Sequence, residues 1–176
     1  STRDNSLVQV DADTYALAYA GHGTDGFIST FDIDSDGDIT AVKTQSEGNN
    51  LRHDTTSTRD NSLVQVDADT YALAYTGAYN DGFISTFTID SDGVITAVKT
   101  QSEGNNLEHD TERGNENSLV KVDADTYALA YMSYDSVDGY VGIISTFTIS
   151  DDGSTITEVD SLEHDDGYAI DNSLVQ

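Results

Sequence analysis

A short acidic stretch in the first third of the chain carries residue types that could hold a metal ion. Carboxylates alternate with other residues ahead of Gly37, at Asp32, Asp34 and Asp36. This spacing is typical of calcium loops, in which oxygens converge on one hard cation and glycine permits a sharp turn. The positions that would complete such a loop hold Thr40 and Lys43, and later copies of the stretch carry fewer acids. We therefore expect a hairpin turn without a cofactor, and Ca²⁺ bound by these aspartates is the alternative.

Histidine followed by aspartate recurs three times along the chain. The pairs are His53-Asp54, His109-Asp110 and His164-Asp165. Three imidazoles brought together by the fold could bind a transition metal. The alternative is a structural histidine at the corner between one repeat and the next, bonded to nearby backbone. We favour the structural role, because a residue that is present in every repeat serves the shared architecture more often than a single site.

Aromatic and imidazole side chains gather in the segments that differ most between repeats. These segments read AGHGTDG, TGAYNDG and MSYDSVDGYVG, and their candidate binding residues are His22, Tyr79, Tyr134 and Tyr140. Exposed rings beside Asp and Asn suit a sugar, which stacks on a ring while its hydroxyls form hydrogen bonds. A glycan is therefore the ligand class that these residues favour.

Nucleophilic catalysis has no motif in this sequence. There is no cysteine, no GxSxG elbow, no phosphate-binding loop and no HExxH pair. The 33 acidic residues against 7 basic ones give a formal charge of −26, which excludes nucleic acid as a partner and disfavours an anionic membrane surface. No apolar run approaches the roughly 20 residues that a membrane-spanning helix needs. We therefore expect a non-catalytic protein that is not inserted in a membrane.

The whole chain of 176 residues is one tandem array built on a repeated stretch. The stretch DNSLVQVDADTYALAY at residues 4–19 returns unchanged at 60–75, returns with two changes at 116–131, and begins again at 171. The repeats are therefore residues 4–59, 60–115 and 116–170, with a partial repeat at 171–176. We interpret the chain as a fragment of a longer repetitive protein, secreted or displayed on a cell surface.

Each repeat has four strand-like runs separated by turn residues. In the first repeat we expect strands at Ser6–Val10, Thr14–Ala20, Gly26–Ile33 and Asp38–Thr44. In the second run Tyr15, Leu17 and Tyr19 point to one face and alanines point to the other, so one face is bulky and the other nearly bare. Such sheets can stack, the bulky face of one over the small face of the next. The segment QSEGNN, at 45–50 and 101–106, is missing from the third repeat and is expected to be a surface loop.

About 50 residues in four antiparallel strands is the size of one β-propeller blade. The chain also resembles the lactonase-like (YVTN-type) propellers, whose blades carry a pattern of the form F-x-ID-x-x-G-x-IT-x-V. Here the pattern stands as FDIDSDGDITAV at Phe31–Val42, FTIDSDGVITAV at Phe87–Val98 and FTISDDGSTITEV at Phe147–Val159. The resemblance implies a fold. It implies no activity, because the catalytic residues of that family have no counterparts here.

The sequence thus predicts an all-β array of three four-stranded blades. A β-trefoil is the alternative fold, and an open β-solenoid is a third. Three blades cannot close a ring, so we expect a homodimer that forms a six-bladed ring and hides the apolar outer faces. The predicted function is that of a structural or interaction module. Carbohydrate binding through the variable loops is the second hypothesis, and a lactonase-like hydrolase is the third.

Overall fold

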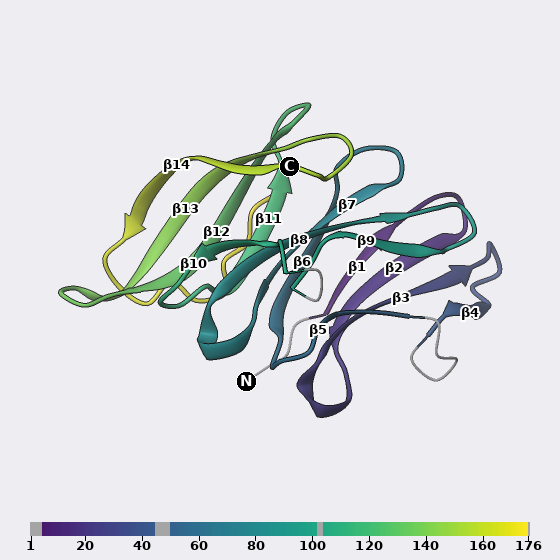
Figure 1. Cartoon of the computed structure of the whole chain (residues 1–176), viewed down its shortest axis with the longest axis horizontal. Coiled ribbons are helices and arrows are strands. Elements are labelled where there is room, and N and C mark those ends of the chain that lie inside the picture. The colour runs from purple at the N-terminus through teal and green to yellow at the C-terminus, as the bar shows by residue number, and fades with distance from the viewer. Residues whose placement is uncertain (1–4, 45–49, 102–103, 176) are drawn as a thin grey trace.

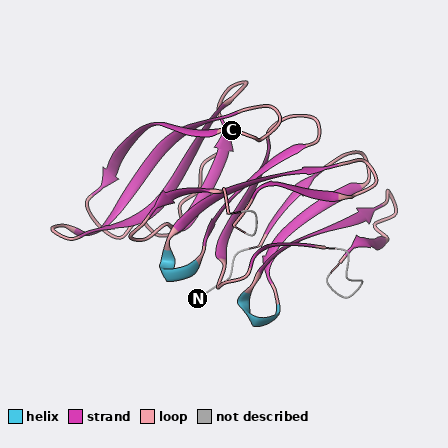
Figure 2. Ribbon diagram, in the orientation of Figure 1, coloured by secondary structure: helices cyan, strands magenta, loops and turns pink. Residues whose placement is uncertain are grey.

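A computed structural model describes residues 5–44, 50–101 and 104–175. Within these ranges the protein is all-β: it contains three antiparallel sheets of five, five and four strands, two short 3-10 turns and no α-helix (Figures 1 and 2). Each sheet is formed by one repeat, and the three sheets stack face to face in chain order. The prediction of an all-β fold is therefore confirmed.

Sheets 1 and 2 share one arrangement, in which the third strand of the repeat pairs with three others. Sheet 1 contains β1 (Ser6–Gln9), β2 (Thr14–Ala20), β3 (Gly26–Ile33), β4 (Ile39–Lys43) and β5 (Leu51–Asp54). Sheet 2 contains β6 (Arg59–Gln65), β7 (Thr70–Thr76), β8 (Gly82–Ile89), β9 (Ile95–Lys99) and β10 (Leu107–Asp110). In each sheet the last two strands pair with different halves of the third strand.

Sheet 3 differs because its outermost strand is uninterrupted. It contains β11 (Asn115–Lys121), β12 (Thr126–Asp135), β13 (Gly139–Ile149) and β14 (Ile156–Asp165). Strand β14 covers the length that β4 and β5 cover together in sheet 1. The predicted QSEGNN loop falls at this interruption in sheets 1 and 2. Most of its first copy (45–49) and part of its second (102–103) lie outside the described residues.

Local sequence accounts for the strands that form the centre of each sheet. The strands predicted at Thr14–Ala20 and Gly26–Ile33 are confirmed at both ends. The turn before β2 is stabilised by Asp11, whose Oδ1 accepts hydrogen bonds from the amides of Asp13 (3.1 Å) and Thr14 (2.9 Å). The fifth strands, β5 and β10, were not predicted, and four-stranded sheets are therefore correct only for sheet 3.

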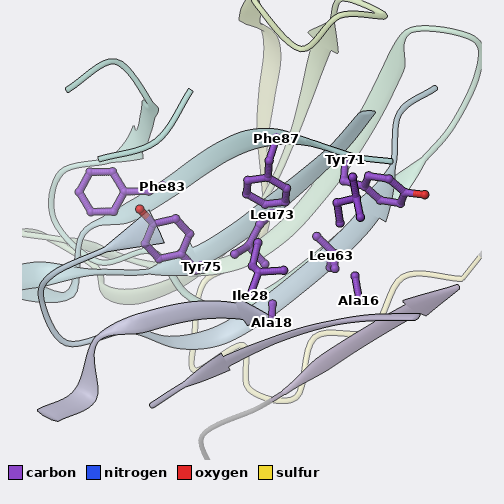
Figure 3. Packing of buried hydrophobic residues seen from close by; sticks show 10 residues of the cluster. Ala16, Ala18, Ile28, Leu63, Tyr71, Leu73, Tyr75, Phe83 and Phe87 are labelled. Carbon is purple, nitrogen blue, oxygen red and sulfur yellow. The ribbon is translucent and has the colours of Figure 1, made fainter. Parts of the chain in front are cut away.

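The sheets stack through one bulky face and one small face, as predicted. Between sheets 1 and 2, the side chains of Ala16, Ala18 and Ile28 meet a layer of large residues from sheet 2 (Figure 3). That layer consists of Leu63, Tyr71, Leu73, Tyr75, Phe83, Phe87 and Ile89. The equivalent residues of sheets 2 and 3 form the second cluster. Both faces of sheet 2 are therefore covered, whereas sheets 1 and 3 each have one face covered by a neighbouring sheet.

Polar bonds repeat between the sheets in the same register. Thr30 Oγ1 donates to the Gly93 carbonyl at 2.8 Å, and Thr86 Oγ1 donates to the Gly153 carbonyl at 2.7 Å. Glycine is required at 93, where φ is 71° and an added Cβ would lie 2.8 Å from Thr30 Oγ1. Each repeat is thus joined to the next by one common set of contacts.

Candidate functional site

The acidic turn serves the hairpin between β3 and β4. Asp34 Oδ1 accepts hydrogen bonds from the amides of Asp36 (2.9 Å) and Asp38 (3.0 Å), while Asp32 Oδ1 accepts one from Thr14 Oγ1 (3.2 Å). Gly37 follows with a φ of 84°. The described part of the chain contains no group of three or more His, Asp or Glu side chains that could hold a metal ion. The predicted ligands Asp32, Asp34 and Asp36 are therefore not brought together.

The repeated histidines lie on strands, which corrects their predicted place at a corner. His53 is on β5 and His109 is on β10, and each packs on a tyrosine of the next sheet with ring centroids 4.8 Å and 4.7 Å apart. Burial lowers the pKa of His53 to about 3. It also lowers the pKa of His109 to about 4, against a smaller opposing effect of the Asp110 carboxylate. Both imidazoles are consequently neutral side chains of the interfaces between sheets.

The histidines face glycines for a steric reason. A Cβ at Gly26 would lie 2.5 Å from His53 Cε1, and a Cβ at Gly82 would lie 2.3 Å from His109 Cε1. Both distances are far below van der Waals contact, so the bare glycine backbone is what admits each ring.

The variable loops of the first two repeats bind the end of their own repeat, at the segment that leads into the next sheet. His22 lies on the exposed turn η1 (His22–Thr24), and Tyr79 lies on η3 (Ala78–Asn80) with 91% of its surface exposed. Positive φ angles turn these loops so that the Thr24 carbonyl accepts from the Thr58 amide and the Asn80 carbonyl accepts from the Gly114 amide, both at 2.9 Å. Within the described residues, neither His22 nor Tyr79 joins the other predicted binding residues.

The third variable loop is an extension of the hairpin between β12 and β13, and it brings two predicted residues together. Tyr134 and Tyr140 lie opposite each other, with ring centroids 5.5 Å apart and near-perpendicular planes. Tyr168 stacks on Tyr140, with ring centroids 4.1 Å apart. Arg113 donates from Nη1 to the Tyr140 hydroxyl at 2.7 Å, and its guanidinium lies 5.0 Å from the ring centroid.

A surface cavity of about 340 Å³ lies at this cluster. Its walls are Glu112, Arg113, Tyr134 and Tyr140. Sequence reasoning missed Arg113 and Tyr168, because they follow the His-Asp pairs and lie far from the variable loops in the chain. The signal was available, since the two occupy one repeat position, held by Ser57 in the first repeat. The cluster combines stacking rings, a cation and a carboxylate, which are the groups that bind sugars.

A second cavity, of about 420 Å³, lies between the β6–β7 turn and Lys121. Lys121 stands where the other repeats have glutamine. Its Nζ donates to the Val66 carbonyl and lies 5.8 Å from the centroid of the Tyr127 ring. The lysine is thus engaged in joining sheets 2 and 3.

The outer face of sheet 1 is the bulky face of the repeat without a covering sheet. Tyr71, Leu73 and Tyr75 of sheet 2 are fully buried, whereas the equivalent Tyr15, Leu17 and Tyr19 are only half-buried. Leu7 is 56% exposed, against 8% for the equivalent Leu63. A cavity of about 260 Å³ lies on this face, lined by Leu7, Leu17, Phe31, Ile33 and Ile39.

The outer face of sheet 3 is the small face of the repeat, again without a covering sheet. It carries the half-buried Ile144 and Thr146 and the nearly buried Ala128 and Ala130 (8% and 5% exposed), which belong to neither core cluster of the described residues. His164 on β14 is exposed, whereas His53 and His109 are buried. Leu162 is 66% exposed, whereas the equivalent Leu51 and Leu107 pack against the clusters.

Comparison with known proteins identifies no relative: no protein-family model matches the chain, and no curated protein matches it. Among the described residues, no helix is both long and apolar enough to span a bilayer.

Proposed function

We propose that this protein is a non-catalytic structural and interaction module that assembles with copies of itself through its two outer faces. One observation carries the proposal: the outer face of sheet 1 and the outer face of sheet 3 are the two halves of the interface that recurs twice inside the chain. A second copy would therefore find on each outer face a surface that its own repeats already pack against.

The paired residues support a head-to-tail contact. In the internal interfaces, the histidine of one sheet packs on a tyrosine of the next. His164 has no following sheet to supply that tyrosine, and Tyr19 has no preceding sheet to supply that histidine. Thr146 stands where Thr30 and Thr86 donate to a glycine carbonyl, and Gly37 has nothing within 4 Å of the position that its Cβ would take. Joining the two faces would pair His164 with Tyr19 and Thr146 with Gly37, in the pattern of the internal interfaces.

Stacked sheets, one per repeat, support a propeller-type arrangement over a β-trefoil, because a trefoil distributes the strands of each repeat between a barrel and a cap. Two copies related by a two-fold axis would give six blades and cover all the outer faces. We place such an acidic, cysteine-free module outside the cell or on its surface, where it would act by binding and not by catalysis.

In solution the chain is expected to run as a homodimer of about twice its mass of 18.9 kDa. Ala128→Leu should convert it into a monomer, because the larger side chain fills the space that the second copy needs. Ala128 is 8% exposed in the single chain, so urea unfolding must show that this monomer is folded. Ala72→Leu is the matched control, since Ala72 is fully buried against sheet 3 within one chain. That change should lower the free energy of unfolding by about 1–3 kcal/mol through overpacking.

Light scattering on a size-exclusion peak measures the mass, and urea unfolding measures the stability. A wild-type chain that remains a folded monomer at micromolar concentration would disprove the self-association and the six-bladed ring.

A glycan site at the cluster of Tyr134, Tyr140, Tyr168 and Arg113 is the second candidate function. Tyr140→Ala is expected to weaken any glycan found on an array by about tenfold or more, because it removes the ring that contacts all three other members. Tyr79→Ala is the control, since Tyr79 is a lone exposed tyrosine on another loop. Equal effects of the two changes, or an array without binding, would exclude this function.

A further inference from the structure

The segment after sheet 3, residues 171–175, lies against β11 in the way that β11 lies against β6. It forms no strand. The Leu174 amide donates to Ser118 Oγ at 2.9 Å. We call the first strand of each sheet (β1, β6, β11) its inner strand. The same bond joins these strands to one another: the Leu63 amide donates to Ser6 Oγ and the Leu119 amide donates to Ser62 Oγ, both at 2.9 Å.

The start of the segment also repeats the earlier copies. The Asp171 amide donates to the Glu116 carboxylate at 3.4 Å, as the Glu116 amide donates to the Asp60 carboxylate at 3.2 Å. Asp171 has a φ of 55°, beside 57° at Glu116 and 53° at Asp60. Three non-glycine residues share this rare conformation at one repeat position, so the segment begins with the same turn of the backbone as β6 and β11.

The residue that leads into the segment is buried in the same place in each copy. Ala169 is 7% exposed, and its Cβ lies 2.6 Å from the position of an added Cβ on Gly142. Thr58 and Gly114 meet Gly26 and Gly82 in the same manner. The segment is therefore anchored to sheet 3 before it reaches Leu174.

We propose that residues 171–175 are the inner strand of a fourth blade whose other strands, β2 to β5, come from a second copy of the chain. In that blade Leu174 pairs with Leu17 of the second copy, in the register that joins Leu7 to Leu17 within one chain. This inference rests on the self-association proposed above and adds the strand exchange that closes the contact.

The strand β1 of the second copy must leave to make room. Residues 4–9 and 171–176 both read DNSLVQ, so the two segments are chemically equal as neighbours of β2. The two segments differ in their contacts with other sheets. Residues 171–175 keep their bonds to sheet 3 through Asp171 and Leu174, whereas Leu7 is 56% exposed. Displacing β1 keeps these bonds but breaks those of β1 to sheet 2, namely the bond from the Leu63 amide to Ser6 Oγ and the packing of Val8. Ser173 and Val175 of the incoming segment stand at the same repeat positions and would remake both contacts.

Engineered disulfides test the exchange, and the natural chain has no cysteine to interfere. The exchange pair is Leu17→Cys with Leu174→Cys, and the matched control is Leu7→Cys with Leu17→Cys. All three side chains are at least partly exposed in the lone chain, so the substitutions are expected to fold. A second set probes the neighbouring register position. Its exchange pair is Ala16→Cys with Val175→Cys, and its control pair is Val8→Cys with Ala16→Cys. The mass of each variant is measured before mild oxidation.

Strand exchange predicts that most of the exchange pair runs as a covalent dimer on a non-reducing gel, while the control pair in the dimer peak forms little disulfide within the chain. A dimer in which the control pair closes and the exchange pair does not would overturn the exchange and leave the self-association standing. A monomeric wild-type chain would overturn both.

Discussion

Alanine in place of Tyr75 is expected to lower the free energy of unfolding by about 3–5 kcal/mol, because it empties the space of a large ring in the interface between sheets 1 and 2. Tyr75 is fully buried. Its ring lies 4.8 Å from that of His53 and 5.7 Å from that of Phe83. Collapse around the cavity is restricted, since strands β5 and β8 hold both neighbouring rings.

The control is Tyr19→Ala, the same change at the same repeat position on the outer face of sheet 1. Tyr19 is half-buried in the lone chain and contacts Phe27, at a centroid distance of 5.9 Å. Urea unfolding of the monomeric Ala128→Leu background should show a clearly smaller loss for Tyr19→Ala than for Tyr75→Ala. Equal losses in that background would contradict the burial difference between the two faces.

Acidification is expected to destabilise the protein between about pH 6.5 and pH 3. An unfolded histidine has a pKa near 6.5, and burial lowers the pKa of His53 to about 3 and that of His109 to about 4. The unfolded chain therefore binds protons that the folded chain does not. The stability is complete above the unfolded pKa and falls by up to about 1.4 kcal/mol per pH unit for each histidine as the pH drops through this window.

The charge of −26 acts in the opposite direction, because protonating exposed carboxylates relieves repulsion in the folded state. A single substitution separates the two effects. In the Ala128→Leu background, His53→Gln should reduce the slope of unfolding free energy against pH between 6 and 4.5. A slope unaltered by His53→Gln would show that the imidazole does not contribute.

Alternation and turn residues were sufficient to predict the central strands. In Thr14–Ala20, every second residue is an alanine, and that pattern alone indicated the two unequal faces. The strand Leu51–Asp54 was missed because its four residues, LRHD, show no such alternation and its position depends on pairing with β3, which is distant in sequence. The misplacement of His53 at a corner has the same origin.

The residues of the candidate site could likewise be predicted only in part. Tyr134 and Tyr140 were identifiable because they stand in the most variable segment of the repeat. Arg113 and Tyr168 were not, because both follow His-Asp pairs, far in sequence from Tyr140, and approach its ring only in the folded chain. Sequence could not reveal that the acidic turn directs Asp34 to backbone amides, since carboxylates that bind a cation and carboxylates that stabilise a turn have the same spacing.

The contact that joins one sheet to the next is the same at each step, and this makes chain length and assembly size independent of each other. A chain with one repeat fewer would still end in the bulky face of its first sheet and the small face of its last. In the proposed ring, the angle between neighbouring sheets would fix how many sheets complete the circle, and the number of repeats would fix how many chains must supply them. Six sheets would require two chains of three repeats or three chains of two, so adding or deleting whole repeats should alter the stoichiometry of the proposed complex without redesigning any interface.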